Sequence, residues 1–359
     1  MLKKYQTLIV KRYLKAFFTI FVALTVFFTG VDFASNLDKL PDSANLKVLF
    51  MLNRFLYFSS FTFSLSLMFA LISSIISLIK ENELVVIYSF GASKDKLLKP
   101  FLYTISFFIV VFWIFNSFNF YVNSVQIAEN IRDYGRVSSY EKDLFLKSGS
   151  SYVYISKLNK YKKEGKNIEV FETDGIELKR VIKAKKGYFR DNFWLLKDVT
   201  IIKKPDLSGS ILDKKLHISH KNTLEVLNGF KPTIMESLYN GDASLTLKDS
   251  VYALFFLQDK GLSTNAIKAN LYKIVFFPMF SLFLGVVLFF MLPLQRRGKR
   301  LGLIMAKLYF ISLLVWGVLY VMTKVSKNGS ISPELGVILP VFALAVFSFY
   351  FYKKKTNSF

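Results

Sequence analysis

A polar segment between two long apolar stretches, residues 80–94, carries the residues best placed to act on a partner. Its apolar side chains recur at helical spacing, at Leu84, Val85, Ile87 and Tyr88. Gly91 is placed to end the helix, and the lysines that follow are typical of the cytoplasmic side of a membrane. The pattern predicts a short helix outside the bilayer that presents the Glu83 carboxylate and an apolar stripe to a partner. A solvated connector is the alternative.

The sequence shows little that could catalyse a reaction. The GxxxxGK[ST] pattern of nucleotide-binding loops, the GxSxG pattern of hydrolases and the HExxH pattern of zinc proteases are all absent. The two histidines, His217 and His220, are three apart in a predicted strand, so they lie on opposite faces and form a poor metal site. We therefore expect no catalytic residue, no metal and no cofactor, with both histidines at the surface.

The composition is that of an integral membrane protein. Of 359 residues, 53% are hydrophobic and 39 are Phe, and the apolar residues are gathered in blocks long enough to cross a bilayer. No Cys is present, which excludes disulfides and thiolate metal sites. The formal net charge of +23 comes from bases that lie beside apolar blocks or alternate with acids. No basic helix with base-reading residues is found, so we exclude nucleic acid as a partner.

Six membrane spans are predicted, each long enough to cross the hydrocarbon core. They run from about 14–37, 55–79, 101–123, 271–294, 303–323 and 335–352. The first is longer than the apolar region of a signal peptide and lacks a small-residue cleavage site, so we expect it to be retained. Asp32, near the outer end of this span, is expected to be solvated at the interface, with a functional role as the alternative.

The distribution of bases predicts the orientation. The N-terminus, the 80–99 connector, the 295–300 turn and the 353–355 tail hold about 16 Lys and Arg, against about 5 in the loops 38–54 and 324–334. Because bases favour the cytoplasm, both termini should be cytoplasmic, and an even number of spans agrees with this. The long segment 125–262 would then lie outside the cytoplasm.

Segment 125–262 is predicted to be a domain of its own, between helical segments 1–124 and 263–359. It contains alternating runs separated by turn signals, at about 151–155, 167–172, 178–184, 192–202 and 214–220, followed by a helix from Leu245. Short strands at this spacing predict an all-β sandwich or jelly roll. Both faces of residues 152–155 are apolar or aromatic, so either protein covers both faces or one face lines a groove for an apolar ligand.

The whole arrangement resembles a known family. Three spans, an outer β domain, three more spans and the connector sequence ELVVIYSFG at 83–91 are similar to the lipopolysaccharide-export permeases LptF and LptG. Residues 152–155 (YVYI), residues 192–199 (NFWLLKDV) and Pro278 extend the resemblance, and the connector is more similar to that of LptG. The resemblance implies a bacterial inner-membrane protein whose connector is a coupling helix that docks into an ATPase. The docking residues would then be Glu83, Leu84, Ile87, Tyr88 and Gly91.

The resemblance also implies the partners and the cargo. A homologous permease subunit would complete a cavity for lipopolysaccharide, a cytoplasmic ATPase dimer would drive it, and a periplasmic β-jelly-roll bridge would receive the lipid beside a single-span regulator. The chain itself would be no enzyme. Residues proposed to line the groove of the β domain are Tyr152, Tyr154, Ile168 and Val170.

One departure from the family pattern concerns the lipid phosphates. LptG proteins have a lysine near the outer end of the first span, where this chain has Asp32. Nearby bases that could substitute are Lys39, Lys47 and Arg54. Two other functions remain open from the sequence: an ABC permease for another lipid or for lipoproteins, and a membrane-anchored sensor or scaffold without an ATPase.

Overall fold

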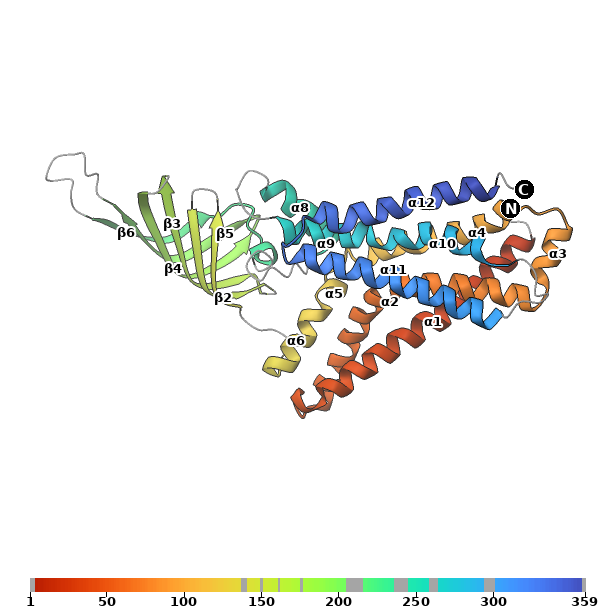
Figure 1. The fold of residues 1–359 in the computed structure, drawn as a ribbon. Coiled ribbons are helices and arrows are strands. Elements are labelled where there is room, and N and C mark those ends of the chain that lie inside the picture. Colours follow the sequence, from red (N-terminus) through yellow and green to blue (C-terminus); the bar gives the residue numbers. More distant parts are fainter. Residues whose placement is uncertain are drawn as a thin grey trace. The chain divides into compact units, whose positions relative to one another are not determined.

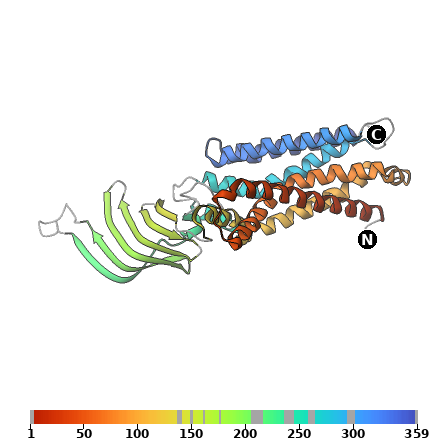
Figure 2. The same ribbon diagram turned by 90° about the horizontal axis from the view of Figure 1, so that it is seen from below.

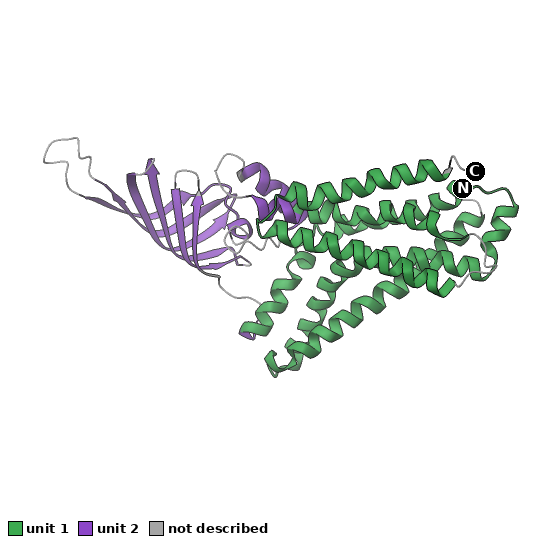
Figure 3. Ribbon diagram, viewed as in Figure 1, with its two compact units in different colours: residues 1–133, 271–359 green, residues 134–270 purple. Residues whose placement is uncertain are grey.

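A computed structural model describes residues 4–136, 141–148, 151–160, 162–174, 177–204, 216–235, 245–257, 264–293 and 301–356. The chain forms two compact units, one made of Met1–Asp133 with Leu271–Phe359 and the other of Tyr134–Asn270 (Figure 3). The first unit is helical, and the second is built on a β-sheet (Figure 1). The basic turn at 295–300 and the turn at Gly175 lie outside the described residues.

The six predicted spans are confirmed as helices long and apolar enough to cross a membrane. They are α1 (Lys4–Asn36), α2 (Ala44–Lys80), α4 (Lys94–Phe115), α9 (Asn265–Val275) with α10 (Phe280–Met291), α11 (Leu301–Lys327), and the π-helical turn η4 (Glu334–Ile338) with α12 (Leu339–Thr356). In the helical unit the two termini and the connector helix α3 (Glu83–Ser89) lie at the same end (Figure 1). This is the arrangement that an even number of spans requires.

The third span ends earlier than the apolar run predicts. Helix α4 stops at Phe115, and two separate helices follow, α5 (Asn119–Val122) and α6 (Ser124–Tyr134). The Asn116 side-chain amide donates to the Phe112 carbonyl at 2.9 Å, and the Ser117 hydroxyl donates to the Trp113 carbonyl at 3.0 Å. Such side-chain bonds offer the backbone an alternative to the helical ladder, which accounts for the early end.

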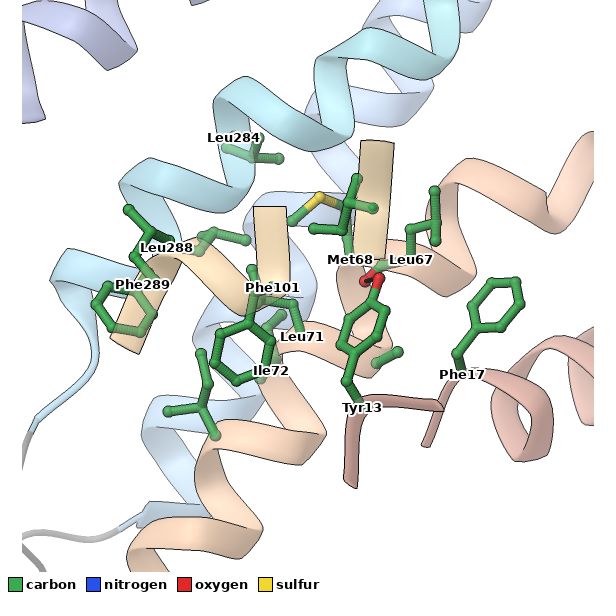
Figure 4. Packing of buried hydrophobic residues seen from close by; sticks show 14 of the residues in the cluster. Tyr13, Phe17, Leu67, Met68, Leu71, Ile72, Phe101, Leu284, Leu288 and Phe289 are labelled. Carbon is green, nitrogen blue, oxygen red and sulfur yellow. Dashed lines mark hydrogen bonds between the residues drawn. The ribbon is translucent and has the colours of Figure 1, made fainter. Parts of the chain in front are cut away.

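The core of the helical unit lies between α1, α2, α4 and α10, and Figure 4 shows part of it. Tyr13 is fully buried, and its hydroxyl donates to the Leu67 carbonyl at 3.1 Å, so the ring joins α1 to α2 without leaving a polar atom unpaired. The Tyr13 ring meets Phe101 edge-on at 5.8 Å, which brings α4 to the same point. Leu288 of α10 is also fully buried in this cluster.

Pro278 interrupts the fourth span. It lies in the 3-10 turn η3 (Phe277–Met279) between α9 and α10. A proline has no N–H, so the carbonyl four residues earlier, that of Ile274, loses its helical donor. The Trp113 indole nitrogen donates to this carbonyl at 3.1 Å instead. The indole therefore both satisfies the freed group and fixes α4 against the break.

The second unit is built on six antiparallel strands in sequence order (Figures 1 and 2). They are β1 (Glu141–Ser148), β2 (Ser151–Asn159), β3 (Glu164–Asp174), β4 (Glu177–Arg190), β5 (Phe193–Lys203) and β6 (His217–Val226). The predicted strands at 151–155, 167–172, 178–184 and 192–202 are confirmed, as is the helix after Leu245, which is α8 (Leu247–Leu257). Strand β1 was not predicted, because its three apolar residues at 144–146 are adjacent and do not alternate.

The predicted β domain between the two sets of spans is confirmed, and its described residues form a six-stranded antiparallel sheet. The strands make one curved sheet in which each strand is hydrogen-bonded to the next one in the sequence (Figure 2). Its buried face is completed by helical segments of the same unit: the Trp194 indole nitrogen donates to the Phe230 carbonyl at 2.8 Å, and the Phe230 ring meets Phe256 of α8 at 5.2 Å. Where a helix and a turn cover the apolar face, no second sheet is needed to bury it.

The buried face is tightly filled where β3, β4 and β5 meet. A Cβ on Gly187 would lie 2.5 Å from Cδ1 of Ile168 and 2.8 Å from Cδ2 of Leu196, distances too short for any side chain. A side chain there would force Ile168 and Leu196 to move, and the fully buried Trp194 beside them leaves little room for this.

Candidate functional site

The connector helix α3 forms as predicted, and its ends have local causes. Asn82 takes a left-handed conformation, with φ of 59°, which separates α3 from α2, and asparagine tolerates this conformation better than most residues. Gly91 has φ of 76°, and its N–H donates to the Tyr88 carbonyl at 2.9 Å. The prediction that Gly91 ends the helix is confirmed, and the positive φ explains why a glycine stands there.

The exposed face of α3 differs from the predicted one. Leu84 and Ile87 were expected to face a partner, but they are 3% and 7% exposed and pack in the core of the helical unit. Tyr88 packs against the same core. The apolar side chains that reach the surface are Val86, which is 52% exposed, Phe90, which is 86% exposed, and the partly exposed Val85. Leu84 and Ile87 therefore hold the helix, while these three residues, the exposed face of α3, are open to a partner.

Arg12 of α1 binds the acidic residues of the connector. Its two terminal nitrogens form a forked ion pair with the Glu81 carboxylate, and Nη2 also lies 2.7 Å from Oε1 of Glu83. Nη1 donates to the Ser77 hydroxyl at 3.1 Å. The bonds from Arg12 hold the pKa of the Glu81 carboxyl below its usual value, so Glu81 stays charged at neutral pH. Sequence analysis missed this contact, because no local pattern links residues this far apart.

Three polar atoms beside α3 are buried and make no hydrogen bond within the described part of the chain. They are Oε2 of Glu83, the Tyr88 hydroxyl and Oδ1 of Asp95. Burial raises the pKa of the Tyr88 hydroxyl, and the Asp95 carboxylate raises it further, so Tyr88 stays neutral. An unsatisfied buried polar atom costs about 1–3 kcal/mol. A partner that brings a cationic donor to this side of α3 would remove that cost.

At the end of the helical unit opposite α3, Asp32 is paired and does not face only solvent as expected. Its Oδ2 lies 3.1 Å from Nε of Arg54, which makes an ion pair whose two atoms are not aligned as a hydrogen bond. Arg54 is 6% exposed and stacks over the Phe50 ring at 5.3 Å. A buried arginine requires a counter-charge, and Asp32 supplies it from the neighbouring helix. Of the three bases proposed to bind lipid phosphates, Arg54 is thus already neutralised, while Lys39 is exposed and Lys47 is half-buried.

This pair gives a first prediction. Asp32→Asn should lower the stability of the helical unit by about 3–5 kcal/mol, because it leaves the Arg54 guanidinium buried without its counter-charge. Thermal unfolding in detergent measures the effect. The double variant Asp32→Asn/Arg54→Gln should recover most of the loss, and Asp38→Asn, which removes an exposed charge nearby, should change little. Equal melting temperatures for Asp32→Asn and Asp38→Asn would contradict the role given to the pair.

The four proposed groove residues of the β domain lie on two different faces. In the register of β2 and β3, Val153 pairs with Val170 and Ile155 with Ile168, and all four are at most 2% exposed. Tyr152 and Tyr154 alternate with them and lie on the other face, where Tyr154 donates to Asp143 at 2.6 Å. Ile168 and Val170 can therefore share one apolar surface, and the two tyrosines belong to another. The alternation itself is as predicted.

The two histidines lie at the surface, as predicted. His217 and His220 are exposed on β6, and Thr200 lies 3.1 Å from Nδ1 of His220. Among the described residues, no group of three or more His, Cys, Asp or Glu is arranged to hold a metal ion.

Comparison with known proteins agrees with the architecture. Residues 7–354 match the family described as Lipopolysaccharide export system permease LptF/LptG. The match includes the connector, the sheet and all six spans except the first residues of α1 and the last of α12. No curated protein matches the chain. The chain is therefore a multi-pass inner-membrane permease of lipopolysaccharide export, and it belongs to the LptF/LptG family.

Proposed function

We propose that this chain is the membrane subunit of an ATP-driven exporter, in which a separate cytoplasmic ATPase acts on the chain through α3. The observation that carries the proposal is the surface of α3. It combines the exposed side chains of Val86 and Phe90 with a carboxylate oxygen of Glu83 that makes no hydrogen bond among the described residues. Apolar anchors beside a buried acceptor are what a partner bearing aromatic pockets and an arginine would bind.

The cargo explains why ATP is needed. Each acyl methylene buried in the bilayer contributes about 0.8 kcal/mol, so a lipid with several chains does not leave the membrane at a useful rate unaided. Apolar side chains on the outer surfaces of several spans, such as Phe27, Phe310 and Phe342, are more than half exposed. In the proposal, a homologous permease subunit covers part of this surface and encloses a cavity for lipopolysaccharide with it. We assign this chain to the LptG member of the pair.

Lys39 and Lys47 are the proposed contacts for the lipid phosphates. Ammonium groups bind phosphate as point charges, and both residues lie at the outer end of α1 and α2. Arg54 would contribute only after exchanging its partner Asp32 for a phosphate. The β domain would then receive the acyl chains on its apolar face, where they would displace α8 and the turn at Phe230. It would pass them to a periplasmic bridge, with a single-span regulator beside the complex.

The orientation proposed here places α3 in the cytoplasm and the β domain in the periplasm. The chain has no Cys, so a single cysteine at Ser93 or at Ser330 would be the only thiol in it. In intact cells an impermeant maleimide should label the Ser330→Cys variant and leave Ser93→Cys unlabelled. Labelling at Ser93 would overturn the orientation, and with it the docking of a cytoplasmic ATPase.

Affinity purification from native membranes tests the proposed function. The chain should copurify with an ABC-type ATPase, a second LptF/LptG-family subunit and lipopolysaccharide. A different lipid or a lipoprotein in the complex would show that the cargo is wrong. A complex without any ATPase would support the sensor or scaffold alternative and contradict the proposal.

A further inference from the structure

Arg12 joins the connector helix to a span that is not its neighbour in the chain. The backbone connects α3 to α2 and α4, whereas Arg12 belongs to α1. Its guanidinium binds Ser77 and Glu81 at the end of α2 and Glu83 at the start of α3. A planar guanidinium holds such partners in a fixed geometry, which a flexible ammonium does not.

The charges around Arg12 make its position sensitive to movement of α3. Glu81 and Glu83 are two residues apart, and both carboxylates bind the same Nη2 atom. Any shift of α3 that separates Glu83 from Arg12 leaves two carboxylates to repel each other with less compensation. Because the Arg12–Glu83 ion pair resists this separation, a shift of α3 pulls α1 in the direction in which α3 moves.

Helix α1 is well placed to respond to such a pull. Its outer half carries exposed apolar side chains, with Val26 at 54% and Phe27 at 62%, whereas α2 is largely buried in the core. The half of α1 that holds Arg12 is fixed to α2 and α4 by the buried Tyr13, so a pull on Arg12 reaches the exposed half through the helix itself. Its exposed face is also available to lipid or to a neighbouring subunit.

We infer that Arg12 is a positioning residue that transmits displacement of α3 to α1 during the ATPase cycle. The inference rests on the proposed function, because the displacement is supplied by the ATPase. A role in folding stability explains the contact less well than a role in transmission. Leu84 and Ile87 already bury α3 in the core. The Arg12–Glu81 pair is partly exposed, with side-chain exposures of 27% and 46%. Partly exposed pairs add little to folding stability.

The first experiment separates docking from transmission. In the purified complex, Arg12→Gln should keep the ATPase bound, because Glu83 and the exposed face of α3 are unchanged. The amount of lipopolysaccharide released per ATP hydrolysed should fall about tenfold. This effect lies between that of losing a fully exposed charge pair and that of losing a buried one. Arg12→Lys should recover only part of this, because it keeps the charge and loses the fork. Lys15→Gln, an exposed base on the same helix, is the matched control and should behave as wild type.

A covalent tether in place of the ion pair tests whether Arg12 transmits movement. A tether should restore transport per ATP if Arg12 has this role, and should not restore it if Arg12 only stabilises the fold. In Arg12→Cys/Glu81→Cys, the two introduced thiols are the only ones in the chain, and a short bismaleimide can join them. Transport per ATP should be low before the reagent and should recover after it. Each single cysteine variant treated in the same way controls for modification of one thiol and should show no recovery.

The outcomes are distinguishable. Full transport by Arg12→Gln, loss of the bound ATPase from Arg12→Gln, or a tether that restores nothing would each overturn the role of Arg12. If the wild-type complex itself contains no ATPase or releases no lipopolysaccharide, the proposed function has failed instead, and the inference falls with it.

Discussion

Glu83→Ala should release the ATPase from the complex, or leave it bound with hydrolysis no longer coupled to transport. The reason is that Glu83, in the first turn of α3, has a buried oxygen, Oε2, which makes no hydrogen bond within the described residues. A cationic side chain of the ATPase that pairs with it would be left buried without a partner. Loss of one member of such a pair costs about 2–5 kcal/mol of binding free energy. Copurification of the ATPase at defined protein concentration measures the effect.

Glu81→Ala is the matched control for this prediction. Glu81 is the more exposed of the two carboxylates and has no buried unpaired oxygen, so its loss should leave the ATPase bound. Both variants should remain folded, because Leu84 and Ile87 still anchor the helix. If Glu83→Ala copurifies with the ATPase and transports as wild type, α3 does not dock through this residue.

The second large effect concerns the β domain. A photo-crosslinking residue at Ile168 or Val170 should capture lipopolysaccharide during ATP turnover, when acyl chains displace the segments that cover this face, whereas one at Tyr152 or Tyr154 should not. The first pair lies on the apolar face of the sheet. The other face carries ion pairs such as Lys183 with Glu169 at 3.0 Å, which acyl chains would have to desolvate. Adducts are detected by mobility shift and by staining for lipid.

The register supplies a matched control for the crosslinking. Val153 pairs with Val170, so a crosslinker at Val153 should repeat the positive result, and one at Phe171, which pairs with Tyr152, should repeat the negative result. Adducts at the tyrosines alone would place the lipid on the opposite face. No adduct at any position would leave the domain without a role in carrying the lipid.

The sequence was sufficient for the elements that depend on local pattern. The spans follow from apolar length, the end of α3 follows from Gly91, and the strands from residue 151 to 202 follow from alternation and turn residues. Each of these signals acts within a few residues, so it can be read without knowing the fold.

What the sequence could not supply depends on contacts between distant segments. In α3 both faces carry apolar side chains, so spacing could not decide that Leu84 and Ile87 pack inward while Val86 and Phe90 remain exposed. Strand alternation predicted the β domain, but it could not decide how the strands divide between sheets, because alternation is the same in one sheet or two.

The two ion pairs at the ends of the helical unit show the same limit. The sequence predicts a solvated Asp32, whereas in the structure Asp32 pairs with Arg54 of α2. The sequence shows Arg12 only as one of several bases near the N-terminus, whereas in the structure it binds the connector. A charge in a span usually has a partner, but the sequence does not say which one.

We propose that ATP hydrolysis by a partner moves lipopolysaccharide through this permease. Release of lipopolysaccharide from proteoliposomes that contain this chain, its homologous subunit and the ATPase measures it directly, with the periplasmic bridge protein as acceptor. Transfer should require ATP, should stop when Glu83→Ala replaces the wild-type chain, and should continue with Lys15→Gln. Equal transfer with and without ATP, or transfer unaffected by Glu83→Ala, would contradict it.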